Sequence, residues 1–340
     1  MDADKQKSRH MALMTVFAMT LVVAGHCDIT SDYKETWVFR WIYSFHMPLF
    51  FFISGFLFAL TNPPERIIPN GAYSSFIKKK SLRLLVPFLF INSIIFIIKA
   101  AFIKDTSLMQ HPLKLSIPSF IETTFLYPTG FMWFLPALFV VFIIAFPFYK
   151  YLKTSRIAIG GGKLLIFTVL AITAIGIIGT FLPPIAFMQI SQAIYYLTYF
   201  LTGILYCEFK PVIDRFIKKY WIGITLLFFA LSASLILKGY LAAFAGIIFS
   251  TSFALILEEK CSDKVVKLAS LCYTVFLLSY FPQMIIRGPI AHLFTDINQY
   301  WLSALSFVAG WLIPVAFGLI FLKLKKRHLL AEKSAILFGL

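Results

Sequence analysis

Two histidines near the ends of neighbouring apolar segments are the residues of this sequence best suited to proton transfer. His26 closes the first apolar run, and His46 lies about one helical turn inside the second. If consecutive helices run in opposite directions, both imidazoles fall at a similar depth and could meet. Imidazole exchanges protons near neutral pH, so such a pair predicts acid–base chemistry. The plainer interpretation, in which each histidine only hydrogen-bonds where its helix ends, stays open.

The sequence around His46 favours a functional role for that segment. The stretch Tyr43–Leu57 is rich in aromatic residues and also holds a proline, a serine and a glycine. Pro48 removes one backbone hydrogen bond and can bend a helix around a cavity. Gly55 allows a neighbouring helix to approach closely, and Ser54 offers it a hydroxyl group. We therefore expect this segment to line a site.

Lys80 and Arg83 form a second candidate site. They are three residues apart, so they share one face of a helix and could clamp a phosphate group. The alternative is a basic anchor that contacts lipid headgroups. The spacing alone favours neither interpretation.

The elements that must position these residues are membrane-spanning helices. The 340 residues are 60% hydrophobic and 14% charged, with a mean hydropathy of +0.85, which is far more apolar surface than a soluble domain buries. The apolar runs approach the roughly 20 residues that a helix needs to cross the hydrocarbon core, and backbone amides in lipid must bond within their own segment. We predict an all-α, polytopic membrane protein of one domain over residues 1–340. The ten predicted helices are Met11–Cys27, Trp41–Leu60, Leu82–Ile103, Phe131–Tyr149, Lys163–Phe181, Ala193–Cys207, Tyr220–Leu237, Tyr240–Leu257, Leu268–Ile286 and Trp301–Leu322.

The basic residues set the predicted topology. With both termini in the cytoplasm, 24 of the 31 Lys and Arg residues fall in segments on the inner side. This imbalance also supports a tight turn at Lys238-Gly239, without which the later clusters would lie outside. Because the net charge of +16 is spread over short clusters between apolar runs, it indicates topology and membrane lipid contact rather than a nucleic-acid partner. The longest outer loop, residues 104–130, is expected to hold a short helix around residues 119–125.

The four cysteines carry no recognisable chemistry. They show neither a CxxC pair nor the spacing of metal ligands, so no metal is expected. The basic leader of the first run resembles a signal peptide. However, the bulky His26 before Cys27 argues against processing, and the run is expected to stay as a helix.

At these residues the sequence resembles acyltransferase family 3, the multispanning acyl-CoA-dependent O-acyltransferases of bacterial surface carbohydrates, and in particular its fucose-4-O-acetylase-like branch. The resemblance extends over most of the chain, and the second-helix motif is its most specific part. The matching elements are Gly25-His26, Phe45–Gly55, Lys80 with Arg83 before Leu-Leu-Val-Pro87, Met132–Leu138 and Tyr273–Gln283.

The resemblance implies an O-acetyltransferase of the bacterial cytoplasmic membrane. Acetyl-CoA would bind from the cytoplasm, with its phosphates near Lys80 and Arg83 and with Ser54 also contacting it. His26 would act as general base on a hydroxyl of a surface or lipid-linked carbohydrate, or pass the acetyl group onward. His46 would orient His26 or stabilise developing charge. On the acceptor side, Trp133 would stack on a sugar ring, and Tyr280 is expected to bind substrate.

Two positions depart from the family pattern. Many relatives have a basic residue where this chain has Thr15, and a histidine where it reads Ser279-Tyr280. The first departure concerns the contact of the donor at the inner side, and the second removes a candidate catalytic group. A transporter or flippase is the alternative function, favoured by the bundle and its proline-containing helices. The absence of an internal repeat and of acidic residues in mid-span counts against it.

Overall fold

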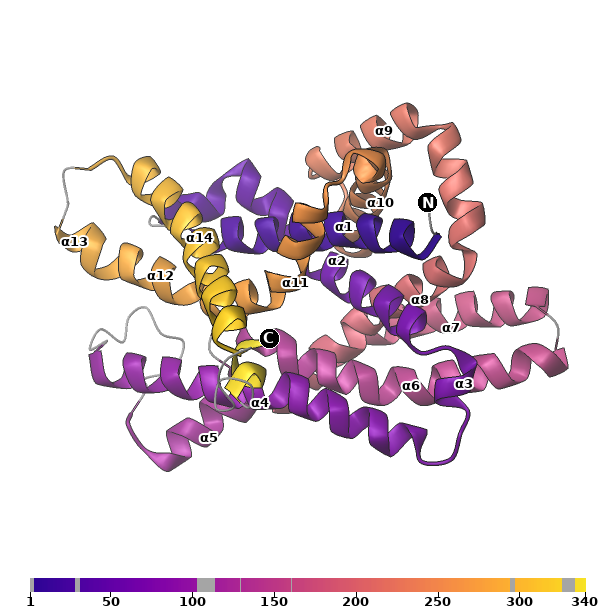
Figure 1. The fold of residues 1–340 in the computed structure, drawn as a ribbon, viewed down its shortest axis with the longest axis horizontal. Helices are drawn as coiled ribbons and strands as arrows, with labels where there is room; N and C mark the ends of the chain where they lie inside the picture. The colour runs from indigo at the N-terminus through magenta and orange to yellow at the C-terminus, as the bar shows by residue number, and fades with distance from the viewer. Residues whose placement is uncertain are drawn as a thin grey trace. The chain divides into compact units, whose positions relative to one another are not determined.

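Helices make up all the regular structure in the described part of the chain (Figure 1). The computed structural model describes residues 3–27, 31–102, 114–128, 130–159, 161–293, 297–325 and 334–340. The chain forms two compact units. Unit 1 comprises Met1–Ser54 and Leu205–Leu340, and unit 2 comprises Gly55–Ile204. The all-α prediction is confirmed, whereas the single domain over residues 1–340 stays a prediction.

Unit 1 is built around α1, which packs against α10, α11 and α14 (Figure 1). Two elements continue beyond it, because the boundaries between the units fall inside α2 and α8. The elements of unit 1 are α1 (Ala3–Gly25), η1 (Ser31–Glu35), the first part of α2 (Trp37–Thr61), the last part of α8 (Ile190–Lys219), α9 (Trp221–Ala233), α10 (Gly239–Leu257), η5 (Glu258–Lys260), α11 (Asp263–Leu278), α12 (Tyr280–Ile285), the π-helical turn η6 (Ile286–Ile290), α13 (Ala291–Leu293), α14 (Gln299–Lys325) and η7 (Ala335–Phe338).

Unit 2 is organised by α6, which packs against α4 and α7. Gly55 lies at its start, on α2, and a Cβ atom there would collide with the backbone of Phe200 on α8. The predicted close approach of a neighbouring helix at Gly55 is therefore present. The further elements of unit 2 are α3 (Pro64–Ile67), α4 (Ala72–Phe102), α5 (Ile117–Phe125), η3 (Gly130–Trp133), α6 (Phe134–Ile159), α7 (Gly161–Phe181) and η4 (Phe187–Gln189).

The apolar helices match the predicted spans in position. Among the described residues, five helices are long and apolar enough to cross a membrane, and seven spans result if two bent pairs each count as one. Each predicted range overlaps one of these helices, a bent pair, or one of the shorter apolar helices Arg9–Gly25 and Leu165–Phe181. The structure is thus that of a polytopic membrane protein. The count of ten and the cytoplasmic placement of both termini stay predictions.

Several helices extend beyond the predicted bounds. Helix α4 begins ten residues before the predicted Leu82, so Lys80 and Arg83 lie within it. Helix α8 continues past the predicted end at Cys207 through a polar stretch in which Lys210 and Asp214 form an i,i+4 ion pair. Hydropathy marks only the part of a helix that lies in lipid. The backbone hydrogen bonds of a helix can continue beyond that part, which explains the early start of α4 and the late end of α8.

Two predicted local features are confirmed. The tight turn near Lys238-Gly239 separates α9 from α10, and Gly239 adopts a φ of +55°, which suits glycine. The short helix expected in the longest outer loop is α5, which Ser116 caps by accepting the Ser119 N–H at 3.4 Å. Other residues of this loop lie outside the described ranges.

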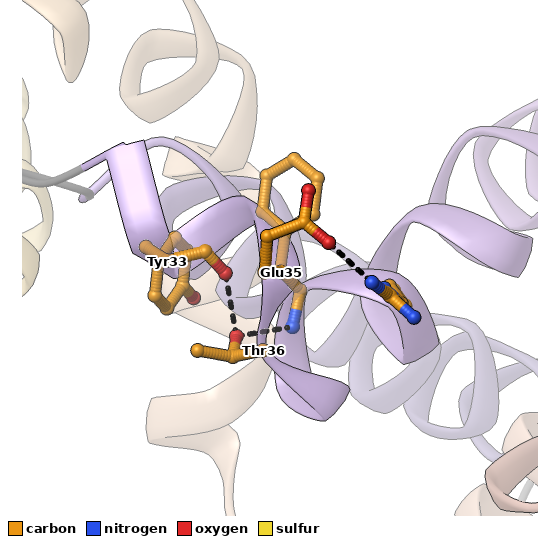
Figure 2. Close-up of polar contacts among 5 residues, drawn as sticks. Tyr33, Glu35 and Thr36 are labelled. Carbon is orange, nitrogen blue, oxygen red and sulfur yellow. Dashed lines mark hydrogen bonds and ion pairs between the residues drawn. The ribbon is translucent and has the colours of Figure 1, made fainter.

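Thr36 fixes the start of α2, the helix that carries His46. Its hydroxyl donates to the Tyr33 carbonyl at 2.6 Å and accepts the Phe39 N–H at 3.2 Å, as Figure 2 shows. An ion pair between Arg40 and Glu35 joins the first turn of α2 to η1 (Figure 2). A hydroxyl that caps the first turn satisfies one of the amides that a helix leaves free there.

Candidate functional site

The last turn of α1 is held by hydrogen bonds from side chains that lie far away in sequence. The Val23 carbonyl accepts the Nε2–H of Gln283 on α12 at 2.9 Å, and the Ala24 carbonyl accepts the hydroxyl of Tyr33 on η1 at 3.0 Å. The last carbonyls of a helix have no partner within it, so these bonds satisfy them. They also fix the position of the next residue but one, His26.

Tyr43 connects the two predicted catalytic histidines. Its hydroxyl donates to the Gly25 carbonyl at 3.3 Å. Its ring centroid is 6.4 Å from that of His26 and 4.7 Å from that of His46, both edge to face. The His46 ring is also close enough to act electrostatically on His26. The structure therefore brings together the two imidazoles that the sequence singles out.

The His46 ring has a defined tautomer. Its Nδ1 lies 2.9 Å from the Ile42 carbonyl oxygen, one turn earlier on α2. A carbonyl oxygen can only accept, so Nδ1 carries the hydrogen and Nε2 of the neutral ring is an acceptor. The side chain is 4% exposed. His46 is thus a buried, oriented imidazole, as a group that supports catalysis should be.

Arg287 stands beside this pair. It is half-buried on η6, its Nε–H donates to the Gln283 carbonyl at 3.3 Å, and its charge acts on His26. Its guanidinium carbon lies 5.6 Å from the ring centroid of Tyr280, a predicted substrate-binding residue. Tyr280 follows the break between α11 and α12, where the chain bends by 45°.

The predicted phosphate clamp lies in unit 2. The Lys80 ammonium sits 4.0 Å from the ring centroid of Phe142 and 5.3 Å from that of Phe76. Lys80 is half-buried, Arg83 is exposed, and the two charges interact across one face of α4. The expected shared face is present, and aromatic rings hold one of its two cations in place.

Trp133 also lies in unit 2 and is part of an aromatic cluster. Its ring centroid is 5.5 Å from that of Tyr196 on α8, and Tyr196 lies 5.1 Å from Tyr195 and 6.0 Å from Tyr199. Ser54 is half-buried on α2 and is the last residue of its segment of unit 1. The predicted residues are thus divided, with both histidines and Tyr280 in one unit and the basic pair and Trp133 in the other.

The structure shows the contacts of both residues at which the sequence departs from the expected pattern. The Thr15 hydroxyl donates to the Met11 carbonyl at 2.7 Å, one turn back in the same helix. Ser279 is buried at the break between α11 and α12 and keeps its backbone bond to the Val275 carbonyl at 2.9 Å.

Sequence reasoning missed the polar groups that hold His26. Gln283 stands inside a motif that the resemblance includes, but its partner Val23 is 260 residues away. Arg287 is one of seven basic residues on the side expected to be poor in them, which is a signal that could have singled it out. Tyr33 and Tyr43 carry no comparable signal, because tyrosines are common where helices end at a membrane surface.

The described helices define a multispanning membrane protein. A family model described as an acyltransferase domain matches residues 12–323. The chain therefore belongs to acyltransferase family 3 and is a membrane acyltransferase. A search of curated proteins finds no match, and neither does a search of solved structures.

Proposed function

We propose that this acyltransferase moves the acetyl group of acetyl-CoA to a hydroxyl of a surface or lipid-linked carbohydrate in a bacterial cytoplasmic membrane. His26 acts as the general base. The hydroxyl oxygen attacks the thioester carbonyl carbon, and the carbon–sulfur bond breaks. The hydroxyl proton passes through His26 to the departing thiolate, which leaves as CoA.

The fixed position of His26 beside His46 carries this proposal. General-base catalysis needs an imidazole held in one place, and the bonds to the carbonyls of Val23, Ala24 and Gly25 provide that support. His46 supports the same site, since its tautomer leaves Nε2 able to accept a hydrogen bond. Such contacts cost little to form here because each one satisfies a carbonyl that the end of α1 leaves open.

The donor is proposed to bind at Lys80 and Arg83. The two cations on one face of α4 suit the phosphates of CoA, and the rings of Phe76 and Phe142 hold Lys80 in position. Ser54 is proposed to contact the same donor. The alternative ligand for this pair is a lipid headgroup. If the pair binds CoA, an excess of anionic lipid should not reduce the binding of CoA.

The acceptor is proposed to be a sugar. Trp133 and Tyr196 present neighbouring aromatic rings in unit 2, and such rings stack on the apolar faces of sugars. Tyr280 is proposed to bind the acceptor from unit 1. The transporter alternative gains nothing from the family match, which is to an acyltransferase.

The experiment measures transfer of labelled acetate from acetyl-CoA to the glycan and lipid-linked fractions of membranes that hold equal amounts of wild type or His26→Ala. Wild type is expected to label these fractions, and His26→Ala to lose about 10²–10⁴-fold in rate. Equal labelling by both would end the catalytic role of His26. Glycan flux in proteoliposomes without consumption of the thioester would instead support the transporter hypothesis.

A further inference from the structure

Arg287 lies on an irregular helical turn near His26. Residues Ile286–Ile290 form a π-helical turn that includes Pro289, directly after α12. Turns of this kind are rare and are frequent at functional sites. Arg287, on this turn, is half-buried. Basic residues of membrane proteins usually lie where they can reach water.

One residue links this arginine to His26. The Gln283 carbonyl accepts Arg287 Nε–H at 3.3 Å, and the Gln283 side chain donates to the Val23 carbonyl at 2.9 Å. The same Val23 oxygen accepts the backbone N–H of His26 at 3.3 Å. Gln283 thus connects the segment that carries Arg287 to the end of α1 that leads to His26.

The other end of the Gln283 amide is open to a hydrogen-bond donor. Gln283 is fully buried, and its Oε1 has no hydrogen-bond partner within the described residues. Gly310 on α14 leaves room for the amide, because a Cβ atom there would lie 2.9 Å from Gln283 Nε2. A buried acceptor without a partner is costly, and a bound polar group would recover that cost.

We propose that Arg287 is a second catalytic residue, which holds the oxygen of the acyl carbonyl while that oxygen gains negative charge, and that Gln283 is its positioning residue. This inference rests on the proposed function. It assigns a role that neither the family match nor the sequence motifs give to these residues.

The chemistry of the transfer requires such a group. When the hydroxyl oxygen bonds to the carbonyl carbon, the carbonyl π electrons move to the carbonyl oxygen and His26 takes the hydroxyl proton. A guanidinium donates hydrogen bonds to that oxyanion and balances its charge. Collapse restores the C=O bond, breaks the C–S bond and returns the proton to the thiolate.

The test compares Arg287→Gln and Arg287→Lys with the control Arg40→Gln in purified, detergent-solubilised enzyme. Arg40 is exposed, pairs with Glu35 and belongs to the same unit. Transfer of label from acetyl-CoA to the glycan fraction gives kcat and KM. Arg287→Gln is expected to lower kcat by about 10²–10³-fold with little change in either KM, and Arg40→Gln to match wild type. Arg287→Lys should recover part of the loss.

Each outcome decides the inference. Wild-type kcat in Arg287→Gln overturns it, and so does an effect confined to the KM of the acceptor, which would make Arg287 a ground-state binder of an anionic acceptor. If Arg287→Gln does not give folded protein, Arg287→Ala with added guanidinium chloride at millimolar concentration replaces it. Rescue of the rate supports the oxyanion role, and a folded variant that cannot be rescued opposes it. No transfer by wild type would instead end the proposed function.

Gln283 is tested by a double-mutant cycle. Gln283→Met keeps the length of the side chain and the backbone carbonyl that accepts Arg287 Nε–H, but removes the hydrogen bond to the Val23 carbonyl that holds this segment on α1. We therefore expect kcat to fall while both KM values stay unchanged. If Gln283 acts through Arg287, the variant carrying both Gln283→Met and Arg287→Gln loses no more than Arg287→Gln alone. Fully multiplicative losses would show that the two residues act independently and would remove the positioning role.

Discussion

Two histidines of this chain, one within α1 and one just after it, lie among polar groups of different kinds. Just after α1, His26 follows carbonyls that accept hydrogen bonds from the Gln283 side chain and from the Tyr33 and Tyr43 hydroxyls. Two turns after the start of α1, His10 is fully buried, with the ring of Tyr206 at 6.1 Å, edge to face. Its surroundings are dominated by ion pairs instead.

The groups around His10 are paired with one another. Lys210 forms an ion pair with Asp214, which also accepts the Tyr206 hydroxyl at 2.6 Å. Lys218 and Glu258 form a second pair at 3.5 Å. Each of these bases has a carboxylate, so the cluster is balanced within itself.

The difference separates a structural cluster from a reactive one. Buried ions that neutralise each other hold helices in register, and breaking one pair is costly because it leaves an unpaired charge. Hydrogen-bond donors held in fixed positions are suited to a negative charge that forms during a reaction. The His10 cluster (His10, Tyr206, Lys210, Asp214, Lys218 and Glu258) should therefore govern stability. The His26 cluster (His26, His46, Tyr43, Gln283 and Arg287) should govern activity.

The strongest test of this difference in function gives both histidines the same substitution. His26→Gln should lower kcat for acetyl transfer by about 10²–10⁴-fold without changing the thermal unfolding temperature, because the base is lost and the packing is kept. His10→Gln should keep kcat near that of wild type. Initial rates and unfolding in one detergent measure both quantities. Equal loss of kcat in the two variants would show that the two ends share one function.

The largest effect on stability should come from the ion pair beside His10. Asp214→Asn leaves Lys210, which is 7% exposed, without its carboxylate, so the free energy of unfolding should fall by about 3–5 kcal/mol. The control is Asp263→Asn. Its partner is Arg9 at 3.0 Å, but the Asp263 side chain is 83% exposed, so about 0–1 kcal/mol is expected.

Chemical denaturation of the purified protein measures these losses. The folded fraction of Asp214→Asn should keep the specific activity of wild type. A variant of normal stability that had lost acetyl transfer would place Asp214 in the reaction and contradict the structural role.

Gly310 tests how tightly the His26 cluster is packed. A Cβ atom at this position would lie 2.9 Å from Gln283 Nε2 and 3.0 Å from Val23 Cγ1. Gly310→Ala should cost about 1–3 kcal/mol in overpacking, and the displaced Gln283 should lower kcat by up to about 10²-fold. Gly223→Ala is the matched control, since nothing lies within 4 Å of its added Cβ. If both alanine variants keep wild-type kcat, the position of Gln283 does not matter for transfer.

The sequence predicts the fold and the two histidines for a physical reason. Apolar runs of membrane length must be helical, so the depth of His26 and His46 follows from counting residues along neighbouring runs. The meeting of these histidines at Tyr43 agrees with that prediction.

The contacts that complete the site could not be predicted, because they join distant parts of the chain. Gln283 reaches the end of α1 only after α11 has ended and the chain has bent by 45° at Ser279. Helical periodicity describes neighbours three or four residues apart and says nothing of such pairs. The polar continuation of α8 is a similar case. Hydropathy ends the predicted helix at Cys207, whereas the Lys210–Asp214 pair sustains it.

The smallest expected effect is also the most direct test of why His10 is there. No hydrogen bond of good geometry reaches its ring within the described residues, although the Thr251 backbone lies close enough to interact with it. A buried polar group that is poorly satisfied costs about 1–3 kcal/mol. His10→Phe removes that cost and keeps an aromatic ring next to Tyr206, at the expense of a larger side chain. The free energy of unfolding should therefore rise by about 0–1 kcal/mol, and acetyl transfer should stay unchanged. Thermal unfolding of the variant beside wild type measures the first quantity, and labelled transfer the second. A clear loss of stability would mean that the imidazole binds a polar group in the folded protein, and His10 would then help to hold the cluster together.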